Sequence, residues 1–340
     1  MENDILLEVK NLCTYFSTEK GKLRAVDHIS FSVKEKEIVG IVGESGCGKS
    51  VTAESIMRLL DEKNLVSYEG EILYKGNNLL SLKKNEMQEV RGKEIAMIFQ
   101  DPMTSLNPVY TIGNQIVEGI LTHQKISKKE AKQKAIDLLR FTEIPSPEKR
   151  FDQYPHELSG GMRQRVMIAL ALACNPKLLI ADEPTTALDV TTQSQILDLL
   201  NKLKDELNMS TIMITHDLGV VAELCSRVIV MYLGQIIEIA NVEDIFDSAQ
   251  HPYTEGLLNS IPHIDGDRSK KLNVIQGTVP TLDKVPVGCN FAGRCQYATD
   301  KCREVEPELK EVMDNHFVKC WNYELIRKTN KEENEIATPY

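Results

Sequence analysis

The architecture of this chain follows from eight consecutive residues, Gly43-Glu44-Ser45-Gly46-Cys47-Gly48-Lys49-Ser50. The apolar run Glu37 to Val42 reads as a buried strand and leads directly into them, and apolar residues recur at helical spacing from Ala53 to Leu60. Glycines in this order let backbone N–H groups wrap a phosphate, while Lys49 reaches the β- and γ-phosphates and the hydroxyl of Ser50 binds Mg²⁺. This strand, loop and helix therefore predict a nucleotide-phosphate site formed by Gly43, Ser45, Gly46, Cys47, Gly48, Lys49, Ser50 and Val51.

Composition limits what kind of protein this is. The chain has 340 residues, 42% hydrophobic and 26% charged, as is usual for a globular protein. No run of about 18 apolar residues occurs, and the polar N-terminus does not resemble a signal peptide. We therefore expect a chain that neither crosses a membrane nor is exported. The net charge of −10 argues against a nucleic-acid backbone as the main ligand, because phosphate contacts need clustered Lys and Arg.

The order of the predicted elements indicates an α/β fold. Short alternating runs in the first 40 residues predict antiparallel strands. Residues 101 to about 160 become helical and Lys-rich, which predicts a helical insertion between two strands. The rest alternates strand and helix: strand 178–181, helix 191–207, strand 210–215, a helix from 218 and strand 227–232. Such alternation predicts a mostly parallel sheet covered by helices.

Two acidic residues end the apolar run Leu178 to Ala181. Asp182 lies at the carboxyl edge of this predicted strand, where open α/β sheets bind their ligands, so we expect it to hold Mg²⁺. Glu183 follows and is our candidate for polarising the attacking water. An acidic pair that merely caps a strand end is the alternative.

A second anion site is predicted at Leu158-Ser159-Gly160-Gly161, which precedes a helical pattern. Free N–H groups and the positive dipole end at a helix N-terminus suit a γ-phosphate. The chain already has one complete phosphate loop, so this site implies a second ATP, held by a second chain facing the first head to tail. Ser159, Gly160, Gly161 and Gln164 are the predicted contacts. An ordinary N-cap at Ser159 is the alternative, but it does not explain the flanking Arg163-Gln164-Arg165.

Together these motifs resemble the ATP-binding-cassette (ABC) ATPases. The resemblance implies a RecA-like α/β core with an antiparallel β subdomain and a helical insertion. Pro184-Thr185-Thr186-Ala187-Leu188-Asp189 is similar to the segment that follows the acidic strand of these ATPases. The family pattern makes Glu183 and His216 catalytic, with His216 contacting the γ-phosphate, and Gln100 a reader of the metal and nucleotide. It also places an aromatic ring on adenine; spacing favours Phe16, with Tyr15 as the alternative.

Two further stretches narrow the resemblance. Asp101-Pro102-Met103-Thr104-Ser105-Leu106-Asn107-Pro108 and His251-Pro252-Tyr253-Thr254-Glu255-Gly256-Leu257-Leu258 resemble the ATPases of dipeptide/oligopeptide importers. This resemblance implies residues 1–250 as the nucleotide-binding domain, 251–325 as a C-terminal extension and 326–340 as a disordered tail. Its implied partners are a related, non-identical ATPase, two transmembrane permease subunits and, indirectly, an extracytoplasmic peptide-binding protein. It also implies a peripheral location on the cytoplasmic face of the membrane.

Four of the eight cysteines gather near the C-terminus, in the spacing Cys289-x5-Cys295-x6-Cys302-x17-Cys320. The resemblance associates this pattern with a [4Fe–4S] cluster, since four thiolates suit one cubane. Zn²⁺ on the same cysteines, or on three of them with His316, is an alternative. Packing cysteines are another.

The expected function is therefore the ATP-hydrolysing, energy-coupling subunit of a dipeptide or oligopeptide importer. The same machine importing nickel or another solute is an alternative. A soluble ABC ATPase acting on nucleic acid or ribosomes is a third reading, although the chain lacks the coiled coils or second cassette usual in such proteins.

Overall fold

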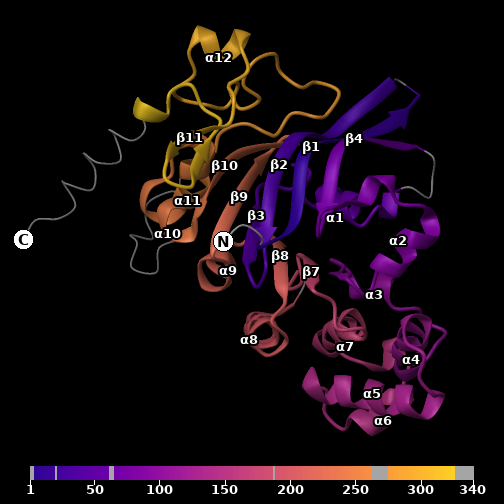
Figure 1. The fold of residues 1–340 in the computed structure, drawn as a ribbon. Coiled ribbons are helices and arrows are strands. Elements are labelled where there is room, and N and C mark those ends of the chain that lie inside the picture. The colour runs from indigo at the N-terminus through magenta and orange to yellow at the C-terminus, as the bar shows by residue number, and fades with distance from the viewer. Residues whose placement is uncertain (1–3, 20, 61–64, 187, 262–274, 326–340) are drawn as a thin grey trace, which may run out of the picture. The chain divides into compact units, whose positions relative to one another are not determined.

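The computed structural model describes residues 4–19, 21–60, 65–186, 188–261 and 275–325 (Figure 1). They form two compact units, each assembled from separate parts of the chain. Unit 1 comprises Met1–Glu8, Ser32–Ile38 and Ile72–Ile214; unit 2 comprises Val9–Phe31, Val39–Glu71 and Thr215–Tyr340. The predicted tail, residues 326–340, lies outside the described residues.

Long strands at the start of the chain run through both units. β1 (Ile5–Thr18) and β2 (Gly21–Lys34) join β4 (Val66–Tyr74) and β5 (Asn77–Asn78) in a sheet of order β2-β1-β4-β5. β4 and β5 pair antiparallel, with Leu73 opposite Asn78. In unit 1 the short η2 (Leu79–Ser81) and α2 (Lys84–Val90) follow, and Asn78 caps η2 by accepting the N–H of Leu80.

The centre of unit 1 is a parallel sheet of β6 (Ile95–Ile98), β7 (Leu178–Asp182) and β8 (Ser210–Thr215). Every residue of these strands is buried, as expected for continuous apolar runs covered on both faces. α8 (Val190–Leu207) connects β7 to β8. It begins at Asp189, whose carboxylate accepts the N–H of Thr192, and ends at Asn208 in the left-handed conformation.

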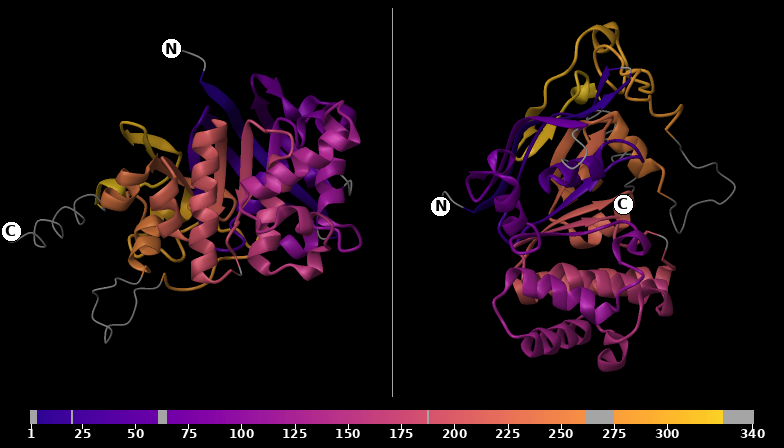
Figure 2. Two further views of the ribbon diagram at one scale, coloured as in Figure 1. Left: turned by 90° about the horizontal axis from the view of Figure 1, so that it is seen from below. Right: turned by 90° about the vertical axis from the view of Figure 1, so that its right-hand side faces the viewer.

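The predicted helical insertion is present in unit 1. Its helices are α3 (Pro102–Ser105), α4 (Ile112–His123), α5 (Lys128–Phe141), α6 (Pro147–Phe151), the turn η3 (Pro155–Glu157) and α7 (Gly160–Leu172). α4 to α7 pack as one group, drawn in magenta in Figures 1 and 2. Gly113 of α4 lies against Phe151, since a Cβ at this glycine would lie 2.4 Å from the ring.

Unit 2 contains a second run of paired strands. β3 (Ile38–Val42) pairs parallel with β9 (Arg227–Tyr232), and β9 pairs antiparallel with β10 (Gln235–Asn241). β12 (His316–Val318) adds to β10, and β11 (Lys310–Met313) adds to β12. The helices of this unit are α1 (Lys49–Ile56), α9 (Leu218–Leu224), α10 (Val242–Ser248), α11 (Pro252–Asn259) and α12 (Asp300–Glu304). The C-terminal segment, residues 251–325, thus adds β12 and β11 to the sheet that contains β3, β9 and β10.

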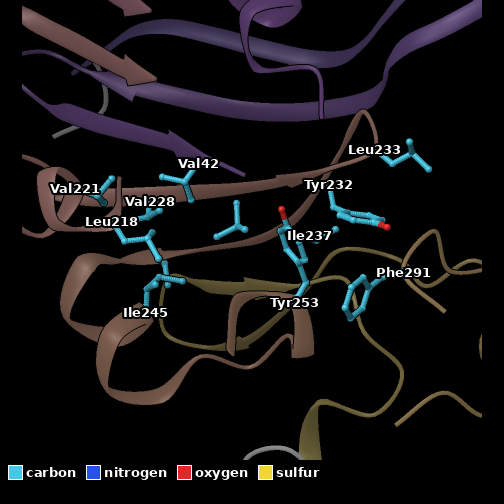
Figure 3. Close-up of a cluster of buried hydrophobic side chains, with 12 residues drawn as sticks. Val42, Leu218, Val221, Val228, Tyr232, Leu233, Ile237, Ile245, Tyr253 and Phe291 are labelled. Atoms are coloured by element: carbon cyan, nitrogen blue, oxygen red, sulfur yellow. The ribbon is translucent and has the colours of Figure 1, made fainter. Parts of the chain in front are cut away.

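Three aromatic rings mark the core of unit 2. Tyr232 of β9, Tyr253 of α11 and Phe291 lie with ring centroids 4.8 to 5.4 Å apart, two of the three pairs edge to face (Figure 3). Such contacts stabilise beyond the apolar area they bury. Because Phe291 and Tyr253 come from the C-terminal segment and Tyr232 from the nucleotide-binding part of the sequence, the two parts share one core.

A buried carboxylate strengthens the same junction. Glu238 of β10 is fully buried and lies 2.7 Å from Nε2 of His316 on β12. It also accepts the backbone N–H groups of Gln250, at 2.6 Å, and His251, at 3.1 Å. A buried charge is tolerated only when it is paired and hydrogen-bonded. The bonds of Glu238 meet this requirement and hold β10, β12 and the start of α11 together.

Candidate nucleotide site

The phosphate loop of unit 2 has the backbone that its glycines predict. Gly43, Gly46 and Gly48 have φ values of +154°, +80° and +102°, which side-chain-bearing residues rarely adopt. A Cβ at Gly43 would lie 2.3 Å from the carbonyl oxygen of Met231. The thiol of Cys47 is fully buried, and burial raises its pKa, so this residue serves the loop as a small packed side chain.

Lys49 is held by the loop itself. Its ammonium donates to the carbonyl oxygens of Gly43, at 2.8 Å, and Glu44, at 3.2 Å, and the side chain is almost completely buried. Gly48 caps α1, whose first residues are Lys49 and Ser50. The loop thus directs its lysine and a helix N-terminus to one place, as an anion site requires.

The two candidate rings for adenine lie on β1. Thr14 points toward α1, because its hydroxyl lies 2.9 Å from that of Ser55. Since side chains alternate along a strand, Phe16 shares this face and Tyr15 lies on the other. Tyr15 is occupied: its hydroxyl donates to Glu69, and the guanidinium of Arg24 lies 5.6 Å from its ring. Desolvation and the bond to Glu69 raise the pKa of Tyr15 to about 12.

In unit 1, Gln100 and Glu183 lie together. The Gln100 amide donates to Glu183 at 3.0 Å, and the hydroxyl of Thr186 donates to the same carboxylate oxygen at 2.9 Å. Glu183 has a φ of +46°, a conformation that costs energy for a residue with a side chain and therefore points to a functional constraint. Asp182, one residue earlier, is the buried last residue of β7.

His216 belongs to unit 2 and is exposed directly after β8. Its neighbour Asp217 caps α9 by accepting the N–H of Gly219 at 2.8 Å. The side chain of Asp217 thus has a structural role at the start of α9.

The segment predicted to bind a second anion lies at the start of α7, in unit 1. Ser159 caps the helix by accepting the N–H of Met162, and Ser159 and Gly160 are exposed. Gly161 packs on α8, where a Cβ would lie 2.5 Å from the methyl of Thr192. Gln164 is different: it is 2% exposed, so contact with a partner's nucleotide would require this side chain to move.

Within the described residues, the four C-terminal cysteines do not bring three sulfur atoms within 4.8 Å of one another. There, only Cys13, Asp27 and His28 bring three ligand atoms within 4.8 Å of one another, and Asp27 is already bound by Arg24 and Gln235. Desolvation raises the pKa of Cys295 to about 11 and that of Cys320 to about 12, which opposes the thiolate form that a metal binds. His316, the further ligand of the zinc alternative, bonds through Nε2 to Glu238 at 2.7 Å.

Sequence reasoning missed the residues that hold the phosphate loop from the C-terminal side. The N–H of Glu44 donates to the hydroxyl of Tyr253 at 2.8 Å, and the carboxylate of Glu44 accepts two bonds from Arg294. Tyr253 lies in a stretch that only the family resemblance singled out, and no local pattern marked Arg294. Among the described residues, no helix has the length and apolar character needed to cross a membrane.

Comparison with known protein families gives two matches. Residues 26–186 match the family described as ABC transporter, and residues 237–302 match the one described as Oligopeptide/dipeptide transporter, C-terminal region. The chain is 55% identical over 318 residues to a probable peptide ABC transporter ATP-binding protein, y4tR, of Sinorhizobium fredii, covering 94% of this chain and 95% of that protein. It is 53% identical to the oligopeptide transport ATP-binding protein AppD of Bacillus subtilis, covering 94% and 97%.

Solved structures agree on the fold. The ATP-binding cassette MJ0796, solved as a dimer bound to ADP and Pi, matches with a TM-score of 0.62 at 29% identity, covering 69% of this chain and 98% of that one. CbiO1 of Clostridium perfringens matches with a TM-score of 0.61 at 29% identity, covering 72% and 92%. The predicted ABC-type α/β fold is therefore confirmed.

The comparisons also correct one prediction. A [4Fe–4S] cluster on Cys289, Cys295, Cys302 and Cys320 is wrong, because the chain belongs with ABC ATP-binding proteins, a family that does not carry such clusters. Metals bind thiolates, whereas desolvation raises the pKa of three of these thiols, Cys289, Cys295 and Cys320, and so opposes the thiolate form. Cys289 and Cys295 instead pack against the core of unit 2.

The alternatives for function are not favoured either, since the relatives are named for peptide transport and not for nickel, nucleic acid or ribosomes. A phosphate loop with the expected backbone, a matching cassette fold and relatives that align over nearly the whole chain all agree. The chain belongs to the ABC transporter family of ATP-hydrolysing cassettes, in the branch that carries the oligopeptide/dipeptide transporter C-terminal region.

Proposed function

We propose that this chain is the ATP-hydrolysing subunit of a membrane importer for dipeptides or oligopeptides. The observation that carries this proposal is the joint presence, in one chain, of a complete phosphate loop and the region 237–302 typical of peptide transporters. Relatives named for peptide transport, 51 to 55% identical, support it. We assign residues 1–250 to the nucleotide-binding domain and 251–325 to a peptide-permease-type extension that contains the four cysteines.

The phosphate loop supplies the first half of the chemistry. Backbone N–H groups of Gly46, Cys47 and Gly48 surround the β-phosphate, and Lys49 exchanges its two carbonyl partners for phosphate oxygens. The residues present suit Mg²⁺, which prefers oxygen ligands: we assign it to Ser50, Gln100 and Asp182. When bound, Mg²⁺ neutralises charge on the β- and γ-phosphates.

Hydrolysis needs a group that orients water. We assign this role to Glu183, whose carboxylate is held in place by Gln100 and Thr186. A carboxylate with one face fixed can accept a proton from the attacking water with the other. His216, exposed after β8, is the assigned contact to the γ-phosphate, and Phe16 is the ring for adenine.

A second cassette is needed for the site at α7. Ser159 and Gly160 leave exposed N–H groups at the start of a 13-residue helix, which suits the γ-phosphate of a nucleotide bound elsewhere. The dimeric structure of MJ0796 with ADP and Pi supports such pairing. We propose a related, non-identical ATPase as the partner, each chain covering the other's phosphate loop.

Contact with the membrane subunits is assigned to the segment after Gln100. Met103, Val109 and Tyr110 are 58%, 72% and 53% exposed, an unusual concentration of apolar side chains on a surface. Gln100 bonds to Glu183 and directly precedes this segment. A movement of the Glu183 carboxylate during hydrolysis can therefore be passed through Gln100 to the segment, within unit 1. We propose that two permease subunits dock here, at the cytoplasmic face of the membrane, and that an extracytoplasmic peptide-binding protein delivers the cargo.

The test is transport by the purified complex. The chain is isolated from native membranes with its associated subunits, placed in vesicles, and supplied with ATP and either a labelled dipeptide, a labelled pentapeptide or radioactive nickel. We expect ATP-dependent uptake of a peptide, because the C-terminal region is of the peptide-transporter type. Uptake of nickel alone, or a complex without permease subunits, would refute the assignment.

A further inference from the structure

We propose that Arg294 and Tyr253 of the C-terminal segment position the phosphate loop for ATP by fixing Glu44, and that the C-terminal segment is thus a working part of the nucleotide site. This inference rests on ATP being the ligand of the loop. All the residues involved lie in unit 2.

Arg294 makes a two-pronged contact with Glu44. Its two terminal nitrogens donate to the two carboxylate oxygens at 2.6 and 3.0 Å, the geometry in which arginine binds carboxylates most strongly. The guanidinium is itself fixed, since Nε donates to the carbonyl of Gln276 at 2.9 Å. The Arg294 side chain is only 6% exposed, so loss of Glu44 would leave a buried cation unpaired.

Tyr253 holds the backbone at the same position. Its hydroxyl oxygen accepts the N–H of Glu44 at 2.8 Å, and the side chain is completely buried. The ring lies against Tyr232 and Phe291, which restrict its movement (Figure 3). The loop therefore receives one backbone bond and one ion pair from a rigid aromatic core.

Glu44 joins this support to the lysine of the loop. Its N–H and carboxylate face the C-terminal segment, while its carbonyl oxygen accepts from Lys49 at 3.2 Å. When Lys49 turns to a phosphate, the carbonyls of Gly43 and Glu44 lose their cation. The loop keeps its conformation through that exchange because Tyr253 and Arg294 hold Glu44 from the other side. A preorganised loop has less conformational freedom to lose when ATP binds.

The experiment measures ATP affinity and turnover separately in the full-length chain. Arg294→Met keeps the apolar stem of the side chain but removes the ion pair. We expect KM for ATP to rise about tenfold with a smaller change in kcat, because ATP must then order the loop as it binds. Arg294→Lys restores the positive charge but not the two-pronged contact with the Glu44 carboxylate, so it should recover part of the lost ATP affinity. Tyr253→Phe removes a single oxygen, and we expect KM to rise about threefold.

Two controls separate positioning from general stability. Lys319→Met breaks another ion pair of the C-terminal segment, with Glu306 at 2.6 Å, and should leave KM unchanged. Arg294→Met combined with Glu44→Gln should be no worse than Arg294→Met alone, because the two side chains act as one pair. Circular dichroism and thermal melting establish that each variant is folded.

Several outcomes would overturn the proposal. One is a folded Arg294→Met chain with native KM; another is additive losses in the double variant. If Arg294→Met does not fold, native KM in Tyr253→Phe and Arg294→Lys overturns it instead. If the native chain binds no ATP, the proposed function fails rather than this inference.

Discussion

The phosphate loop and the four-cysteine segment were both inferred from spacing, and they turned out differently. In the loop, spacing specifies a backbone: Gly43, Gly46 and Gly48 adopt positive φ values that the chain needs at those positions. In the C-terminal segment, the spacing specifies only the residue type, and desolvation raises the pKa of Cys295 and Cys320. A pattern is informative when it constrains geometry, and much less so when it only supplies residues of the right type.

The same contrast extends to energetics. Among the polar residues of the motifs, Glu183 lies in a costly conformation and Ser159 is exposed, as expected of groups kept for chemistry. In contrast, His316 of the C-terminal segment and its partner Glu238 are completely buried and bonded to each other. We therefore expect changes at Glu183 to lower turnover at constant stability, and changes at Glu238 or His316 to lower stability at constant turnover.

The largest effect is expected at Glu183. Glu183→Gln keeps the shape of the side chain but cannot take a proton from water, so ATP turnover should fall by roughly 10²- to 10⁴-fold. ATP binding and the unfolding midpoint in urea should stay native. Asp198→Asn, an exposed carboxylate of α8, is the matched control and should change neither. Native turnover in Glu183→Gln would contradict the catalytic role that we assign to Glu183.

Next in size is the buried carboxylate of Glu238. Glu238→Ala leaves His316 and the N–H groups of Gln250 and His251 without their partner, so the free energy of unfolding should drop by about 3–5 kcal/mol. Urea unfolding measures this loss, and the folded fraction should hydrolyse ATP at the native rate. Glu304→Ala, at an exposed position, should shift stability by less than about 0.5 kcal/mol. If the folded fraction hydrolysed ATP more slowly than the native chain, Glu238 would affect turnover as well as stability, and the contrast between the two regions would be wrong.

The smallest expected effect is a dependence of stability on pH that comes from His251. Burial lowers the pKa of His251 from its usual 6.5 to about 3, and its neutral ring accepts the N–H of Tyr253. Below pH 6.5 the unfolded chain binds a proton that the folded chain does not, so stability is lost as pH falls toward 3. At pH 5 the lowered pKa of His251 reduces the free energy of unfolding by up to about 2 kcal/mol relative to neutral pH.

The measurement is urea unfolding at pH 7 and pH 5 for the native chain and for His251→Asn. Asparagine can still cap α11 but does not titrate, so the variant should lose less stability on acidification. Equal losses in both proteins would show that His251 is not the group that responds.

Much of the fold could be predicted because the relevant signals are local. The apolar runs of β6 to β9, the helix after Lys49 and the helical insertion all follow from periodicity and from residues that begin or end elements. The contacts of Glu44 could not be predicted, since Arg294 lies 250 residues away in sequence and no local pattern pairs the two. Burial of Gln164 was equally hidden: the motif places it beside the predicted anion site, but its position on α7 turns it into the core.

Gly161 has a consequence for chimeric proteins. Its place against the methyl of Thr192 means that this glycine is required by the chain's own packing as well as by any ligand at α7. A graft that transfers the segment around α7 into another cassette must therefore bring the matching surface of α8, and the two positions should be exchanged as a pair.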